Sequence, residues 1–243
     1  MSPEQEFMPR VPHAPVQNRV LAALPREDYR RLAQYLETVP VTFGQVLYEP
    51  GARMRHVYFP ESCVISLLTV VGQGKAAEVG VVGNEGVVGG STTLGIQVSH
   101  LRAVVQGTGT VVRITASRLH KEFRANGPWY RELFRFTEVL MNQTAQTAAC
   151  NRFHKVEARL ARWLLATRDR VHSNNFRLTH EFLSLMLGVR RVGVTAAAAN
   201  LQKRKVIAYS RGNIQLLDPK GLEAAACECY GAVKEMYRRS YRE

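Results

Sequence analysis

The stretch that decides the fold runs from residue 179 to residue 201 and reads THEFLSLMLGVRRVGVTAAAANL. Its apolar residues recur at helical spacing on both sides of Gly188, which predicts two short helices joined at a glycine. Glycine allows the left-handed backbone that a sharp turn between helices needs. Thr179 suits the cap of the first helix, because its hydroxyl can accept a hydrogen bond from a free backbone amide. The stretch therefore predicts a helix-turn-helix.

The start of the second helix carries residue types that read DNA. In a helix-turn-helix the second helix enters the major groove with its N-terminal residues against the base edges. Arginine suits this place, since its guanidinium can donate two hydrogen bonds to the acceptor edge of guanine. An ordinary helical hairpin with solvated arginines is the structural alternative. We expect base contacts from the outward-facing residues Arg190, Arg191, Val192 and Thr195.

A small basic hairpin is predicted after this helix. The runs 206–209 and 214–217 flank Ser210-Arg211-Gly212-Asn213, which is typical of a tight turn between two strands. A helix-turn-helix followed by such a hairpin makes a winged helix. We expect contacts with DNA phosphates from Thr179, Lys203, Arg204, Lys205 and Arg211.

Positive charge is concentrated in the same part of the chain. The 243 residues carry a formal net charge of +13, which favours a polyanionic partner. Residues 152–243 hold 18 Lys and Arg against 8 Asp and Glu, whereas residues 1–151 hold 15 against 12. The excess lies beside the helix-turn-helix, where neutralisation of phosphates would require it.

The N-terminal half has the pattern of a β-domain. Between about residues 39 and 114, short runs rich in Val, Ile, Thr and Tyr alternate with Gly, Pro and Asn, which predicts a β-sandwich or jelly-roll-like barrel. One or two short helices, interrupted at Pro25, are expected before it. Residues 1–17 contain four prolines and little periodicity, which predicts a loose arm.

A long helix is predicted from Gly127-Pro128 onward. Its large side chains recur at alternating gaps of four and three, which indicates a heptad-like seam. A helix packed only on its own β-domain is the alternative. We favour a dimer seam on this face, with Phe134, Met141, Ala145 and Ala148 packing on the β-domain from the second face. The predicted dimer interface comprises Trp129, Leu133, Phe136, Leu140 and Thr147.

Two further helices complete the predicted fold. The helix 155–171 would direct Arg159, Arg162, Arg168 and Arg170 outward, and one final helix would run from Leu222 to about Tyr237. The fold class is α+β: an N-terminal jelly-roll-like β-roll, a long dimerisation helix and a C-terminal winged helix-turn-helix. The predicted units are a flexible arm, a β-roll sensor domain, a long helix with its hinge, and a DNA-binding domain, at residues 1–17, 18–126, 127–153 and 154–243.

This order of elements resembles the Crp/Fnr family of bacterial transcription regulators. The local matches are LYEPG at 47–51, AACNR at 148–152, EARLARWL at 157–164, and the segment 178–217. The resemblance implies a homodimer that binds a near-palindromic operator in double-stranded DNA and recruits or blocks RNA polymerase. It also implies that the β-roll senses a signal.

The family comparison changes the expected operator. Members of the family place a glutamate and an arginine of the second helix on bases. The arginine falls on Arg191, the glutamate position is Val192, and a later arginine position is Ala196. The operator is therefore expected to differ from that of the best-known members, with Arg190 and Thr195 as substitutes. Val192 can still contact a thymine methyl group.

The effector pocket of the family is matched only in part. Its cyclic-nucleotide binders hold the ribose hydroxyl with a glutamate and the cyclic phosphate with an arginine. The glutamate position here is Gly90, whereas Arg102-Ala103 matches the second step. A cyclic nucleotide or another small effector remains open, and no cofactor is required. The effector residues implied by the resemblance are Glu85, Gly89, Gly90, Arg102 and Ala103.

The cysteines favour a reducing compartment, the cytoplasm. Cys63, Cys150, Cys227 and Cys229 are too few and too scattered for a disulfide scaffold. Cys227-Glu228-Cys229 could bind a metal or sense redox state, but with no second cysteine pair nearby we predict buried thiols and no metal site. The family's iron–sulfur members need an N-terminal cysteine cluster, which is missing. No apolar run approaches the ~18–20 residues that cross a bilayer, so no membrane partner is expected.

Enzyme classes find little support. A cupin-type metalloenzyme needs two closely spaced histidines, a carboxylate and a third histidine, and the seven histidines include no such pair in the β-region. Neither a Gly-x-Ser-x-Gly nucleophile motif nor a Walker phosphate loop occurs. We therefore predict no catalytic residues. An RNA-binding regulator that uses the same basic face is the main alternative, although the second helix lacks exposed aromatics for stacking on bases; a β-roll metalloenzyme fused to a helical domain is a weaker one.

Overall fold

The computed structural model describes residues 16–72, 75–122 and 127–241. The predicted arm therefore lies almost wholly outside the described residues. Two short helices, α1 (Arg19–Ala22) and α2 (Arg26–Ala33), begin the described chain, and the break between them falls at Pro25. Asn18 caps α1 by accepting hydrogen bonds from two backbone amides, and its own amide group donates to the carbonyls of Pro60 and Gly86. This buried asparagine fastens α1 to the β-domain.

The N-terminal β-domain consists of two antiparallel sheets. One has the strand order β1-β7-β3 and the other β2-β6-β4-β5. Their inner faces share one apolar core, whose largest fully buried side chains include Phe59, Ile65 and Ile114. A short 3₁₀ helix, η1 (Gly90–Leu94), lies between β5 and β6, and α3 (Ala116–Glu122) follows β7. The strands are β1 (Glu37–Val41), β2 (Val46–Tyr48), β3 (His56–Pro60), β4 (Ile65–Val71), β5 (Lys75–Val82), β6 (Arg102–Val105) and β7 (Gly109–Thr115).

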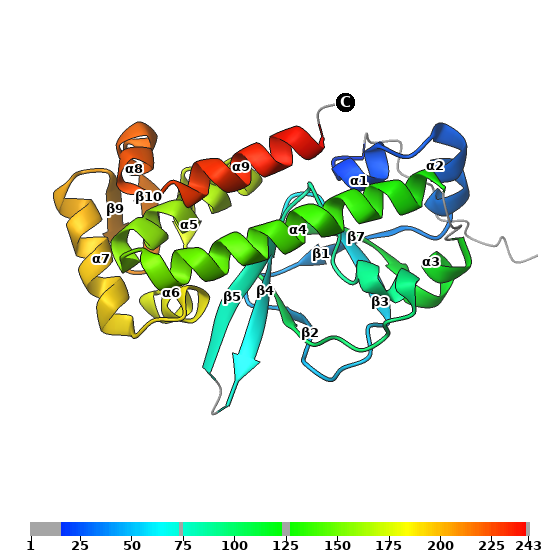
Figure 1. The fold of residues 1–243 in the computed structure, drawn as a ribbon, viewed down its shortest axis with the longest axis horizontal. Coiled ribbons are helices and arrows are strands. Elements are labelled where there is room, and N and C mark those ends of the chain that lie inside the picture. The colour runs from blue at the N-terminus through cyan, green and yellow to red at the C-terminus, as the bar shows by residue number, and fades with distance from the viewer. Residues whose placement is uncertain (1–15, 73–74, 123–126, 242–243) are drawn as a thin grey trace, which may run out of the picture.

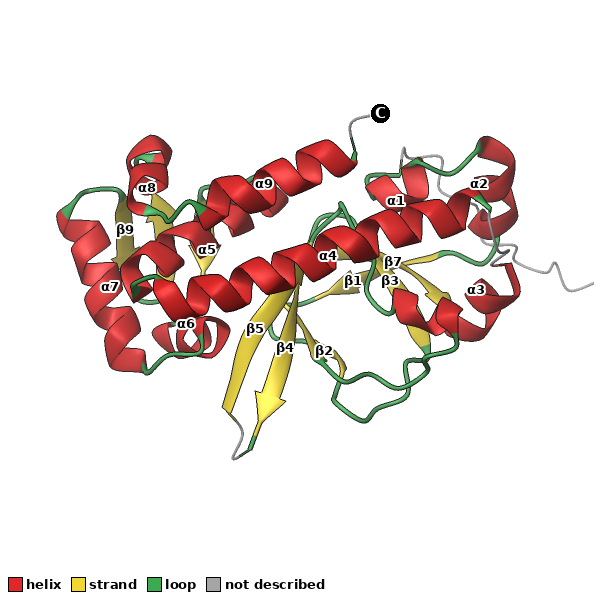
Figure 2. Cartoon of the chain, in the orientation of Figure 1, coloured by secondary structure: helices red, strands yellow, loops and turns green. Residues whose placement is uncertain are grey.

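The long helix α4 (Pro128–Phe153) runs from the β-domain to the C-terminal part of the molecule (Figure 1). It is flanked by the β-domain and by the last helix, α9 (Cys229–Ser240), which runs back beside it (Figure 2). The fold class is α+β, as predicted.

The predicted dimer seam on α4 is wrong, because its side chains are covered by the chain itself, all but Thr147 by the core of the β-domain. Trp129, Leu133, Phe136 and Thr147 are buried, and Leu140 is half-buried against the same core.

Three glycines of the β-domain explain this choice of face. A Cβ atom at Gly86 would overlap the Phe136 ring, and one at Gly90 would lie 2.7 Å from Leu133. A Cβ atom at Gly80 would lie 3.0 Å from Leu140. Because no side chain stands in the way at these three positions, α4 approaches the sheet closely. The second face of α4, with Phe134 and Met141, is left exposed.

The C-terminal part is a winged helix. Helices α5 (Val156–Val171), α6 (His180–Leu187) and α7 (Arg191–Lys203) pack around a core that includes Leu160, Leu183 and Leu201. Beside them lies a sheet with the order β8-β10-β9, made of Asn175–Arg177, Asn213–Leu216 and Ile207–Ser210. The turn between β9 and β10 has positive φ at both Arg211 (48°) and Gly212 (82°), as a two-residue type I′ hairpin requires.

Two expectations about the remaining helices are wrong. The final helix is broken into α8 (Pro219–Ala225) and α9, and the break contains Cys227. In α5, Arg159 and Arg170 do not point into solvent. Arg159 is buried and donates a hydrogen bond to the Leu187 carbonyl, while Arg170 forms an ion pair with Glu85 of the β-domain.

The winged helix is docked on the β4–β5 hairpin. Leu68 and Ala76 of this hairpin belong to the same apolar core as Leu183 of α6. The turn of the helix-turn-helix lies against β5, since a Cβ atom at Gly188 would lie 2.9 Å from that of Ala77. Among the described residues, no single helix is both long and apolar enough to cross a membrane; α6 and α7 meet the criterion only as a pair, bent by 107°.

Candidate functional site

The helix-turn-helix presents its predicted base-reading residues to solvent. Thr179 caps α6, with its hydroxyl oxygen accepting from the Phe182 amide at 3.1 Å, and Gly188 has φ +61°. The next helix, α7, begins at Arg191, and Arg190 occupies its N-cap position. Arg190 and Arg191 are exposed, and Val192 has 72% of its surface exposed. The side chains that would face the bases are therefore accessible to a partner.

His180 connects α7 to the hairpin of β9 and β10, the wing of the winged helix. The His180 ring stacks on Tyr209 of β9, with 4.4 Å between the ring centroids. Its Nδ1 lies 3.0 Å from the hydroxyl of Thr195. Burial and the nearby charge of Arg191 lower the pKa of His180, so the imidazole is neutral at physiological pH. Thr195 is exposed, but its hydroxyl is already oriented by this contact.

The predicted phosphate-contacting residues lie on the surface around α7 and the β9–β10 hairpin, and one of them, Arg204, is already paired with an acidic side chain. Lys203, Lys205 and Arg211 are exposed, and Lys205 and Arg211 both have positive φ in turns. Arg204 is instead paired with Glu157 of α5, with 3.2 Å between Nη1 and Oε1. Because this pair is exposed, water screens it and a phosphate can compete for the guanidinium.

The structure separates one of the five predicted effector residues, Glu85, from the other four. Arg102 is paired with Glu49, with 2.8 Å between Nε and Oε2, and Ala103 is buried in β6. Gly89 lies against the Tyr48 hydroxyl and Gly90 against Leu133. Glu85 faces a different part of the molecule, the junction with the winged helix. Ala103 pairs with Tyr48 of β2, whose hydroxyl lies beside Gly89, so these residues remain near one another while Glu85 lies apart.

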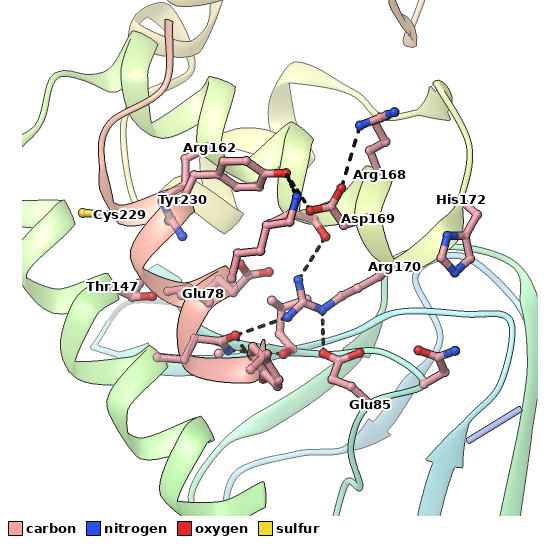
Figure 3. Close-up of a pocket in the computed structure, with 18 of the residues that line it drawn as sticks. Glu78, Glu85, Thr147, Arg162, Arg168, Asp169, Arg170, His172, Cys229 and Tyr230 are labelled. Carbon is pink, nitrogen blue, oxygen red and sulfur yellow. Dashed lines mark hydrogen bonds and ion pairs between the residues drawn. The ribbon is translucent and has the colours of Figure 1, made fainter. Parts of the chain in front are cut away.

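A cavity of about 660 Å³ lies at that junction. It is bounded by β5, α4, α5 and α9, so it touches the β-domain, the long helix and the DNA-binding part (Figure 3). Its charged lining residues are Arg19, Glu78, Glu85, Arg162, Arg168, Asp169, Arg170 and Lys234.

A nearly buried ion pair crosses the junction beside this cavity. Arg170 Nε lies 2.7 Å from Glu85 Oε1, and the two side chains are 10% and 9% exposed. The same guanidinium donates to Gln143 Oε1 at 3.3 Å. Near the end of α9, the Tyr237 hydroxyl also donates to Gln143, and the Tyr241 hydroxyl donates to the Glu85 carbonyl at 2.9 Å. This network joins α4, α5 and α9 to the loop after β5.

A buried carboxyl group also lies between the two parts. Glu78 of β5 accepts hydrogen bonds from Trp163 Nε1 at 3.0 Å and from Gln106 Nε2 at 2.7 Å. Burial raises its pKa from 4.5 to about 7, because a charged carboxylate is poorly solvated there. The folded state therefore binds a proton that the unfolded chain has lost between about pH 4.5 and 7.

We expect Glu78→Gln to remove a pH-dependent loss of stability. The contribution of Glu78 is fully present below pH 4.5 and is lost as pH rises through about 7, since ionisation must then occur in a buried site. At pH 8 the variant should unfold with a free energy higher than the wild type by ~2 kcal/mol, and near pH 4 the two should differ little. Gln106 Oε1 has no partner at present, so that amide can turn to accept from the new side chain. Urea unfolding from pH 4 to 8 measures the difference; equal curves would show that water reaches Glu78.

The sequence analysis missed a cluster of metal-binding residue types. Cys150 and His154 at the end of α4 lie beside Cys227 and Cys229 at the start of α9, with their ligand atoms all within 4.8 Å of one another. The prediction of no metal site rested on Cys227 and Cys229 alone. The spacing of Cys150 and His154, four residues apart on one helix, was the signal that could have found the other half.

Comparison with known proteins gives the same architecture. A family model described as a Crp-like helix-turn-helix domain matches residues 158–225, which confirms the predicted motif. A CRP-family transcriptional regulator from Thermus thermophilus is 18% identical with a TM-score of 0.66, over 77% of this chain and 96% of that one. A putative crp/fnr regulator from Eubacterium rectale is 17% identical with a TM-score of 0.68, over 85% and 97%. No curated protein matches the chain.

One structure of similar fold is described by its ligand. It is the c-di-GMP-responsive global regulator CLP from Xanthomonas campestris, 14% identical with a TM-score of 0.65, over 79% of this chain and 99% of that one. All three proteins are described as regulators, two of them as transcriptional regulators of this family. At such identities they establish the fold, and the Crp-like helix-turn-helix supports DNA binding.

Proposed function

We propose that this chain, which carries a Crp-like helix-turn-helix domain in the fold of the CRP/FNR regulators, is a sequence-specific DNA-binding transcription regulator and not an enzyme. It acts in the cytoplasm as a homodimer on a near-palindromic operator and communicates with RNA polymerase. The observation that carries the proposal is the exposure of Arg190 and Arg191 at the start of α7, directly after the capped helix α6 and the turn at Gly188.

The exposed face of α4 is the proposed dimer interface. Phe134, Met141, Ala145 and Ala148 recur at gaps of seven, four and three on this face, which is the spacing of a two-stranded helical seam. Met141 is 65% and Phe134 48% exposed in the single chain. Two copies paired about a twofold axis would cover these side chains with their own equivalents. The two copies of α7 would then contact half-sites about 34 Å apart.

Selection from a random pool of duplex DNA tests the function. The full-length protein should enrich a near-palindrome whose half-sites are one helical turn apart. A pool of single-stranded RNA, run in parallel, distinguishes the alternative partner. Enrichment from the RNA pool only, or from neither pool, would contradict the proposal.

The junction cavity is the proposed effector site, in place of the pocket predicted within the β-domain. A ligand there would touch the β-domain, the long helix and the DNA-binding part together, so it could change their relative stability. The arginines of its lining favour an anionic ligand. Repeating the selection with a panel of cyclic mono- and dinucleotides tests this class. A ligand-dependent change in the enriched sequences that persists in an Arg102→Ala variant would support the junction cavity. Loss of this change in that variant would instead support a ligand site at Arg102 of β6.

Arg191→Ala is expected to reduce discrimination between operator and random DNA. A bidentate contact with guanine provides ~1–3 kcal/mol of discrimination, so operator affinity should fall about 5- to 150-fold more than affinity for random duplex. Fluorescence anisotropy with both duplexes measures this. Arg26→Ala, which removes an exposed arginine of α2, controls for the loss of one charge. Equal losses on both duplexes would make Arg191 a phosphate contact.

Lys205→Ala is expected to weaken binding to every sequence alike. Loss of one phosphate contact should reduce the slope of log affinity against log salt by about one. A salt titration from about 50 to 300 mM provides the slope. Arg204→Ala should change it less, because Glu157 already compensates that guanidinium. An unchanged slope for Lys205→Ala would remove this lysine from the interface.

A further inference from the structure

Three cysteines and a histidine meet where α4 ends and α9 begins. Cys150 Sγ lies 3.5 Å from Cys227 Sγ, and Cys229 Sγ lies 3.6 Å from His154 Nδ1. The three thiols are buried, while the imidazole is partly exposed. All three cysteines are free, and the 3.5 Å separation between Cys150 and Cys227 is far longer than a disulfide bond of about 2.05 Å.

These distances match the edges of a tetrahedron around a zinc ion. With Zn–S of about 2.3 Å and Zn–N of about 2.0–2.1 Å, two ligand sulfurs lie about 3.8 Å apart and a sulfur and a nitrogen about 3.6 Å apart. All four ligand atoms lie within 4.8 Å of one another. Such a set encloses one ion rather than a multi-iron cluster, and three thiolates with one imidazole is a common donor set of structural zinc.

The groups around the four ligands are those that zinc sites use. The second ring nitrogen of the histidine, Nε2, lies 3.1 Å from Glu228 Oε1, so the carboxylate can fix the tautomer that leaves Nδ1 free to bind metal. Gln146 Nε2 donates to Cys229 Sγ at 3.0 Å. Three thiolates and one zinc ion carry a net charge of −1, and the positive charges of Arg159 and Arg162 act on Cys150. These charges therefore favour a thiolate at Cys150.

We propose that Cys150, His154, Cys227 and Cys229 bind a structural zinc ion. Cys150 lies on the last turn of α4 and His154 directly follows this helix, while Cys229 begins α9 and Cys227 lies two residues before it. The ion fastens the C-terminal helix to the long helix at the point where the DNA-binding part begins. Binding replaces the thiol protons with the metal and closes the coordination shell with protein atoms alone.

Metal analysis of the full-length protein tests the site without relying on DNA binding. Protein expressed with added zinc and purified without chelator should contain about one zinc ion per chain. Cys227→Ser and Cys150→Ser should each lose most of it. Cys63→Ser, which removes a buried thiol of the β-domain outside the cluster, should retain it. Equal loss in the Cys63 variant, or iron with inorganic sulfide in the wild type, would overturn the assignment.

Two further measurements use only the wild-type protein, so they do not depend on whether the cysteine variants fold. A thiol-specific mercurial should release about one zinc ion per chain, detected with a chromogenic chelator. Cobalt(II) added to the metal-free protein should give the strong visible absorption of a tetrahedral thiolate site, and one equivalent of zinc should abolish it. A metal-free wild type with all its thiols titratable and no cobalt spectrum would overturn the proposal, while leaving the proposed DNA-binding function untouched.

Discussion

Met141→Glu is expected to convert the protein into monomers and to weaken operator binding at least ~100-fold. Met141 is the most exposed apolar residue in the middle of α4, and a twofold axis would bring two introduced carboxylates together in an apolar seam. A dimer binds two half-sites with the second contact made intramolecular, which is worth about 10²–10⁴ in affinity. Analytical ultracentrifugation gives the mass, and fluorescence anisotropy gives the affinity.

Two matched variants make this result specific to the proposed face. Leu94→Glu introduces the same charge at an apolar residue of η1 that is 50% exposed, and it should leave both mass and affinity unchanged. Leu133→Ala, in the originally predicted seam, should instead lower the free energy of unfolding by ~2–5 kcal/mol, because it creates a cavity under α4. A Met141→Glu protein that remains dimeric would show that another surface pairs the chains.

Arg170→Met is expected to lower the free energy of unfolding by ~3–5 kcal/mol. The substitution leaves the Glu85 carboxylate in a nearly buried site with its cation removed, and an uncompensated buried charge is strongly destabilising. It also removes the donor to Gln143. Because these groups join the β-domain to α5, the loss should also favour separation of the two parts. Urea unfolding followed by tryptophan fluorescence measures the free energy.

The double variant Arg170→Met with Glu85→Gln isolates the charge effect. Removing the carboxylate together with its partner should recover most of the lost stability, since no unpaired charge then remains at this pair. A single-variant cost below about 1 kcal/mol would be that of an exposed pair. It would mean that solvent in the junction cavity screens the two groups.

Local signals explain why so much of the winged helix could be predicted from the sequence. The cap at Thr179, the turn at Gly188 and the hairpin turn at Arg211-Gly212 depend on residues within one or two turns of each other. Helical periodicity does not say which of two apolar faces meets which surface. On α4 that choice depended on glycines of the β-domain, Gly86 and Gly90 among them, which lie far earlier in the chain.

Local sequence signals could not predict the thiol cluster or the ion pair at the junction, because each depends on residues that lie far apart in the chain. Cys150 and Cys227 are separated by 77 residues, and the break between α8 and α9 that turns Cys227 toward α4 was expected to be helical. Arg170 and Glu85 are likewise 85 residues apart. A helical pattern placed Arg170 on the outer face of α5, but α9 and the β-domain cover that face.

The contact of the helix-turn-helix turn with β5 has a consequence for the geometry of the target. Gly188 lies against Ala77 and the Phe182 ring lies 4.9 Å from that of Phe43, so contacts at two points tie the helix-turn-helix to the β-domain. If two subunits pair as proposed, a base pair added between the two half-sites rotates one of them around the DNA axis, and these contacts limit how far the helix-turn-helix can turn to follow it. The proposed dimer is therefore expected to distinguish operators by the length of their spacer as well as by the bases of their half-sites.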